Sequence, residues 1–242
     1  MRTVLGHLVE VANRREHGSG RRRRDISVKR TSLVGIAAAI VYIGGHILLA
    51  PIPGGGDTTA EDFQKFYVTD DNTGVAIAGV LVLTIGCLGM LWFFHEVREH
   101  IETPLARAGF VSTAVGLALV VAGAAIVAGP SGVQFNSDEP FVGNAVAHAL
   151  AQAGYGVMLI GGAMFLGLGV GMLAVAGRRI GVLVPWVGIA GIVAAVLQVV
   201  GYIWLPMFAI PLWVLIVAIT GLRSVGGSAS PVGSRSPSSE VS

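Results

Sequence analysis

Seven polar side chains interrupt the apolar stretches of this sequence and could together bind a ligand. They fall into three sets, each spaced by three or four residues: Tyr42 with His46, His148 with Gln152 and Tyr155, and Gln198 with Tyr202. This spacing places the members of each set on one face of a helix. Polar groups inside a membrane are costly unless they face each other or water. If the three faces converge, they predict a polar ligand-binding pocket that opens to the outside.

The residue types in this pocket favour binding over catalysis. A falling outside pH would charge His46 and His148 first, which would also suit a pH-sensing or proton-coupled role. Haem ligation by the same two histidines would require both to point inward at the same depth. The simpler alternative is that these side chains form hydrogen bonds between helices, with His148 and Tyr202 at the membrane interface. We expect no bound cofactor.

A second cluster of titratable residues, HEVREH, begins at His95 and ends at His100. A zinc site of the HExxH type needs two histidines four residues apart, so that both face one metal ion. Here they are five residues apart, or about 140° around a helix. Within the cluster, His95 and Glu99 are four residues apart, as are Glu96 and His100, so each pair lies on one face of a helix. We therefore expect a solvated, charge-balanced helix end and no metal site.

No motif in the sequence supports an enzyme. The GxSxG turn of serine hydrolases is absent. The predicted spans contain no Asp or Glu, which argues against an ion pump or a carboxylate proton relay. We predict a protein without catalytic activity.

The first element that must position the polar sets is the uncharged stretch 33–52, which follows a basic run. The run consists of Arg21, Arg22, Arg23 and Arg24. About 20 apolar residues in a helix span a hydrocarbon core of roughly 30 Å. Positive charge keeps its end of a span in the cytoplasm, and we expect these arginines to contact anionic lipid headgroups.

Composition supports a membrane protein with several spans. Of the 242 residues, 53% are hydrophobic and 12% are charged, against about 25% charged in soluble domains. The mean hydropathy is +0.75. Nine of the sixteen basic residues lie within the first thirty positions, which points to a lipid surface rather than to nucleic acid.

The sequence predicts an all-α transmembrane bundle of six spans within residues 33–223. The expected spans are residues 33–52, 74–94, 108–128, 149–176, 181–201 and 207–222. Inner loops, one of them at 95–107, carry almost all Lys and Arg, and the outer loops are acidic. This pattern predicts a bacterial inner-membrane protein with both termini in the cytoplasm. The sixth span is short, and a re-entrant hairpin there would leave five crossings.

The flanking and connecting segments complete the organisation. Residues 1–32 predict a largely disordered basic leader, with a short amphipathic surface helix as the alternative, and residues 224–242 predict a disordered Ser/Pro-rich tail. In the outer loop at 53–73, the threonines before Ala60 predict a capped helix whose Phe63, Phe66 and Tyr67 face the bilayer interface.

Glycines in the fourth span predict close helix packing. Gly167 and Gly171 are four residues apart, a spacing that lets another helix approach closely. We expect the fourth span to be central and the chain to form homo-oligomers through these two glycines.

Four segments resemble parts of uncharacterised multi-pass membrane proteins common in actinobacteria. They are residues 66–72, 91–102, 181–201 and 212–223. The resemblance covers roughly residues 33–223 and implies a six-helix membrane protein without supplying an activity. Two function classes stay open: a small permease or ligand-binding membrane protein that uses the polar pocket, and a structural or regulatory partner that uses glycine faces and tails.

Overall fold

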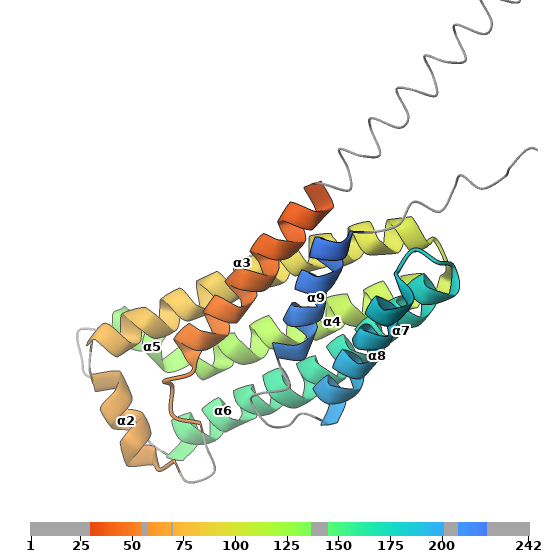
Figure 1. Ribbon diagram of the computed structural model, residues 1–242. Coiled ribbons are helices and arrows are strands. Elements are labelled where there is room, and N and C mark those ends of the chain that lie inside the picture. Colours follow the sequence, from red (N-terminus) through yellow and green to blue (C-terminus); the bar gives the residue numbers. More distant parts are fainter. Residues whose placement is uncertain (1–29, 55–57, 69, 137–144, 201–207, 222–242) are drawn as a thin grey trace, which may run out of the picture.

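The computed structural model describes residues 30–54, 58–68, 70–136, 145–200 and 208–221, and within these ranges every regular element is a helix (Figure 1). The predicted all-α class is confirmed. The helices are Arg30–Leu49, α2 (Ala60–Val68), α3 (Asp70–Ile101), α4 (Pro104–Val127), α5 (Gly129–Phe135), α6 (Ala145–Gly156), the π-helix η1 (Val157–Gly162), α7 (Ala163–Arg179), α8 (Pro185–Val200) and α9 (Ala209–Thr220). The predictions for the leader, for Arg21, Arg22, Arg23 and Arg24, for Tyr202 and for the tail at 224–242 fall outside the described residues.

In the part of the chain that the structure describes, four helices are long and apolar enough to cross a membrane, which indicates a membrane location. They are Arg30–Leu49, Asn72–Ile101, Pro104–Val127 and the continuous stretch Ala145–Arg179. α8 has 16 residues and α9 has 12, so they reach about 24 Å and 18 Å at roughly 1.5 Å per residue. Both are shorter than a hydrocarbon core of roughly 30 Å. Four of the six predicted crossings thus have a helix of sufficient length, and the last two stay predictions.

The helices extend further than hydropathy indicates. Where we expected an inner loop at 95–107, α3 continues to Ile101 and α4 begins at Pro104. Only Glu102 and Thr103 connect them, with Glu102 in the left-handed region at φ 48°. The Thr103 side chain accepts a hydrogen bond from the backbone N–H of Ala106 at 3.1 Å and so caps α4. A fall in hydropathy indicates where a helix leaves the lipid, but the helix itself can continue beyond that point, as α3 does.

Glycine backbones form the contact between α4 and the fourth span. One glycine row lies on α4 and the other on α6–α7: Gly109, Gly116 and Gly123 face Gly169, Gly162 and Gly154. A Cβ added at Gly169 would lie 2.6 Å from the carbonyl oxygen of Gly109. The two helices therefore touch backbone to backbone, which side chains of any size would prevent.

The π-helix η1 keeps this glycine row in phase. The α4 glycines are seven residues apart throughout, whereas the facing glycines are seven apart and then eight apart across η1. A π turn holds one residue more than an α turn, which absorbs the extra position. Gly154 consequently faces α4, and its neighbour Tyr155 is turned toward another part of the chain.

The first helix packs on α3 in the same close manner. A Cβ added at Gly45 would lie 2.5 Å from the backbone nitrogen of Leu83, and one at Gly86 would lie 2.5 Å from that of Tyr42. Near the start of the first helix, the Arg30 guanidinium lies 5.3 Å from the centre of the Trp92 ring of α3. This cation–π contact ties the two helices together at the end of the bundle that also holds the α3–α4 link.

α2 closes the opposite end of the bundle, beside α5 and the start of α6 (Figure 1). Thr59 and Asp62 form a reciprocal cap: the Thr59 hydroxyl accepts from the backbone N–H of Asp62, and the Asp62 carboxylate accepts from that of Thr59, both at 3.1 Å. The predicted capped helix is thus confirmed. The prediction for Tyr67 is wrong, because its side chain is fully buried against the protein.

Candidate functional site

The first predicted set, Tyr42 and His46, lies buried in the first helix. His46 is 2% exposed, and its Nδ1 donates to the carbonyl oxygen of Tyr42 at 3.1 Å. The two rings are 4.5 Å apart, and the ring of Phe208, just before α9, is 6.4 Å from His46. With Nδ1 occupied by this hydrogen bond, Nε2 is the ring nitrogen that could bind another group.

The second predicted set is held partly within α6 and partly across the bundle. Gln152 Nε2 donates to His148 Nε2 at 3.2 Å, and both side chains are half-buried. The Tyr155 hydroxyl donates to the carbonyl oxygen of Ile52 at 2.9 Å. Tyr155 therefore fastens α6 to the end of the first helical segment, which is a structural contact.

The third predicted set is represented by Gln198 on α8. Gln198 is 4% exposed, and a Cβ added at Gly167 of α7 would lie 3.3 Å from its Cβ. Among the residues that the structure describes, its Oε1 has no hydrogen-bond partner. A buried amide oxygen in this state is costly unless water or a ligand supplies the donor.

The structure brings together Tyr42 with His46 and His148 with Gln152, whereas Tyr155 bonds to Ile52 and the partner predicted for Gln198 lies outside the described residues. The predicted pocket that would join the three sets stays a prediction. His46 and Gln198 each lie near the end of one short helix: Gln198 precedes the end of α8 by two residues, and the His46 ring contacts that of Phe208, immediately before α9.

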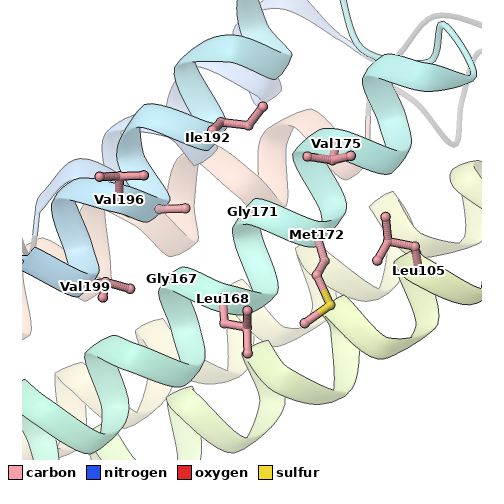
Figure 2. Close-up of a pocket in the computed structure, with 10 residues that line it drawn as sticks. Leu105, Gly167, Leu168, Gly171, Met172, Val175, Ile192, Val196 and Val199 are labelled. Atoms are coloured by element: carbon pink, nitrogen blue, oxygen red, sulfur yellow. The ribbon is translucent and has the colours of Figure 1, made fainter.

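Two apolar grooves lie elsewhere on the described surface, and neither is lined by the predicted site residues. The larger, of about 500 Å³, runs between α7 and α8 (Figure 2). The smaller, of about 380 Å³, lies between α3 and α4 and includes Thr84 and Cys87. Hydropathy records only the apolar character of a span, so these gaps between side chains could not be located from the sequence.

Sequence reasoning also missed the role of Tyr67. Its hydroxyl donates to the carbonyl oxygen of Val127, at the end of α4, at 3.0 Å. Burial raises the pKa of this phenol above its ordinary value, so it stays a neutral donor. The position of an aromatic residue in a loop helix does not reveal whether it faces lipid or protein.

The histidines of HEVREH lie in the last turns of α3 and make separate contacts. The His95 ring lies 5.7 Å from that of Phe110 on α4, and His100 Nδ1 donates to the carbonyl oxygen of Glu96 at 2.7 Å. Arg98 pairs with the neighbouring Glu99. These contacts agree with a charge-balanced helix end.

Gly167 and Gly171 pack against α8 of the same chain. A Cβ added at Gly167 would lie 2.9 Å from the carbonyl oxygen of Ala195, and one at Gly171 would lie 3.3 Å from the Ala195 Cβ. The close approach predicted for them thus occurs within the chain, and homo-oligomer formation through them stays a prediction.

Comparisons with protein-family models, with curated proteins and with solved structures find no match to this chain. The resemblance to multi-pass proteins of actinobacteria therefore stays a prediction.

Proposed function

We propose that this chain is a non-catalytic membrane protein that binds a small polar ligand and acts as a small permease. The supporting observation is that two buried polar side chains, His46 and Gln198, lie beside the ends of α8 and α9. In membrane transporters, interrupted or short helices end near the middle of the bilayer, and their ends bind substrates and coupling ions. Gln198 Oε1 would accept a hydrogen bond from the ligand, and His46 Nε2 would supply a second polar contact.

The position of the charged residues supports an outward-facing site in a bacterial inner membrane. Most described basic residues belong to one end of the bundle: Arg30, Arg98, Arg107, Arg178 and Arg179. The opposite end carries α2, with Glu61 and Asp62 beside Lys65. By the positive-inside rule, the arginine end faces the cytoplasm, and so would both termini.

Cysteine accessibility tests the site without knowledge of the ligand. Cys87 is the only native cysteine, and it is replaced by Ser so that only an introduced thiol can react. His46→Cys and Gln198→Cys are then made separately in this background. A charged, membrane-impermeant methanethiosulfonate reagent is added outside intact cells. Such reagents modify only thiolates that water reaches. A ligand site that opens to the outside is reached by water, so we expect both cysteines to react. Val193→Cys, at a side chain of α8 that is 51% exposed and faces lipid in this proposal, is the matched control and stays unmodified.

The same reagent tests the orientation. Thr59→Cys, at the start of α2, is expected to react from outside, and Glu99→Cys, near the end of α3, only after the cells are opened. The reverse pattern would refute the orientation. Protection of both His46→Cys and Gln198→Cys in a correctly oriented protein would refute the binding site.

The double variant His46→Ala, Gln198→Ala distinguishes the permease from the alternative, a structural or regulatory partner. Under the permease proposal, this variant folds and inserts but loses uptake in a screen of small polar solutes with reconstituted vesicles. A variant that folds, inserts and takes up the solutes as the unmodified chain does would refute the permease proposal and favour the structural role. The glycine rows that such a partner would use for association pack within the chain, at Gly109 against Gly169 for example.

A further inference from the structure

The larger apolar groove runs along part of α7 and part of α8. Its walls are side chains from one stripe of each helix, with one contribution from α4 (Figure 2). On α7 the stripe includes Leu168, Met172 and Val175, and on α8 it includes Ile192 and Val196. Leu168 to Val175 covers about 10 Å at roughly 1.5 Å per residue. The groove therefore extends at least this far along the helices and is lined by hydrocarbon.

The groove exists because its floor lacks side chains. Gly167 and Gly171 face Ala195 across it, so the α7 and α8 backbones come close while the longer side chains on either side stand apart. Val196 on the outer wall is 57% exposed. The groove thus opens sideways onto the surface that a bilayer would cover.

Two arginines stand at one end of the groove. Val175 on the α7 wall is followed three and four residues later by Arg178 and Arg179, which continue the same helix face. The stem of Arg178 also crosses to α8, since a Cβ added at Gly188 would lie 2.8 Å from the Arg178 Cβ. Gly188 is one turn before Ile192 of the groove. Both arginines are exposed residues and are thus available to an anion at the groove mouth.

We infer that this groove is a binding site for one anionic phospholipid. An acyl chain fills the apolar groove, and the phosphate lies between Arg178 and Arg179, whose planar guanidinium groups pair with phosphate oxygens. Basic groups between helices on the cytoplasmic side are the usual partners of such headgroups. The apolar walls give a soluble ligand no hydrogen-bonding group, and a helix from a second copy would leave the two arginines without counter-charge.

The test counts the lipids that stay on the purified full-length chain. The protein is reconstituted with equal amounts of palmitoyl-oleoyl phosphatidylglycerol and phosphatidylcholine, extracted gently, and examined by native mass spectrometry. We expect one retained phosphatidylglycerol, favoured over phosphatidylcholine by roughly tenfold or more. Val196→Phe, which fills the groove from its exposed wall, abolishes this retention. Arg178→Gln with Arg179→Gln removes the preference for the anionic lipid.

Two control variants make the same kinds of change at residues that do not line the groove. Val193→Phe adds a ring at an exposed α8 side chain that does not line the groove, and Arg98→Gln with Arg107→Gln removes two charges from the same end of the bundle. Both retain phosphatidylglycerol as the unmodified chain does. Should Val196→Phe fail to fold, Val175→Phe fills the groove from the α7 wall.

Three results would overturn the inference. The first is unchanged retention in both groove-filling variants. The second is displacement of the lipid by soluble glycerol phosphate, which would mean that the arginines bind phosphate without the groove. The third is a dimer of the unmodified chain that Val196→Phe converts to monomers, which would make the groove an interface between copies. None of these results depends on His46 or Gln198, so they leave the proposed permease site untouched.

Discussion

Adjacent glycines in the first helix allow the backbone contact with α3 to be tested with a built-in control. A Cβ added at Gly45 would lie 2.5 Å from the backbone nitrogen and 2.6 Å from the Cα of Leu83. Real Cβ contacts are essentially never shorter than 3.0 Å, so Gly45→Ala must push the two helices apart by about 0.5 Å. No rotamer change can relieve the clash, because the opposing atoms belong to backbone. By contrast, a Cβ at Gly44 meets no described atom within 4 Å.

The expected cost follows from these distances. Overpacking of this kind costs about 1–3 kcal/mol, and a chain of this size loses about 2–4 °C of Tm per kcal/mol. Both substitutions gain the same helix propensity of about 1 kcal/mol over glycine, which cancels in the comparison. We therefore expect Gly45→Ala to unfold roughly 2–12 °C below Gly44→Ala.

The assay is the loss of the monodisperse peak in size-exclusion chromatography after heating in detergent, followed by fluorescence of a fused reporter protein. Equal melting of the two variants would show that the first helix and α3 do not touch at these positions, and the close packing derived for them would be refuted.

Three further predictions concern single hydrogen bonds. Tyr67→Phe removes the donor to the carbonyl oxygen of Val127 and is expected to lower the unfolding free energy by about 0.5–1.5 kcal/mol, measured by denaturation in mixed micelles. An unchanged unfolding free energy would mean that the Tyr67 hydroxyl bonds to water instead of to Val127. The hydrogen bonds from Thr59 lower the pKa of Asp62 below its ordinary value of 3.8. The cap of α2 is therefore intact above pH 3.8 and is lost as the pH falls through the lowered pKa. Thr59→Ala is expected to return the pKa of Asp62 toward 3.8, measured by NMR titration of the carboxyl carbon. Trp213→Phe removes the indole N–H that donates to an α8 carbonyl oxygen at 2.9 Å and is expected to lower the unfolding free energy by about 1–3 kcal/mol or more. Trp186→Phe, at an exposed side chain, is the control and is expected to leave the unfolding free energy unchanged within about 0.5 kcal/mol.

Much of the helical architecture is predictable from the sequence because apolar length and capping residues act locally. The uncharged stretch at 33–52 predicts the first helix, and the threonines before Ala60 predict α2 with its cap. The α3–α4 link was harder, since the polar residues after Phe94 leave the lipid while continuing the helix. Its signal was present in Thr103 and Pro104, a capping residue followed by a proline suited to the first helical position.

The site and the packing depend on contacts that are distant in sequence. The pairing of Tyr42 with His46 follows from spacing, but the approach of Phe208 to His46 depends on how α9 folds back. The α4 glycines at seven-residue intervals could have been noticed in the sequence, since a repeated small residue predicts a helix interface. Their partners could not be identified, because the spacing there changes at η1.

The additional residue accommodated by η1 can be lost without changing which face of α6 meets α4. Deletion of one residue between Val157 and Gly162 would leave Gly154 seven residues before Gly162, the interval that the α4 glycines keep, so a regular α-helix would hold the row in phase. A regular α-helix advances 100° per residue, so if η1 became α-helical at unchanged length, Tyr155 would replace Gly154 against α4, and its anchor to Ile52 would be lost. Relatives of this chain that lack the π turn should accordingly be one residue shorter in this segment.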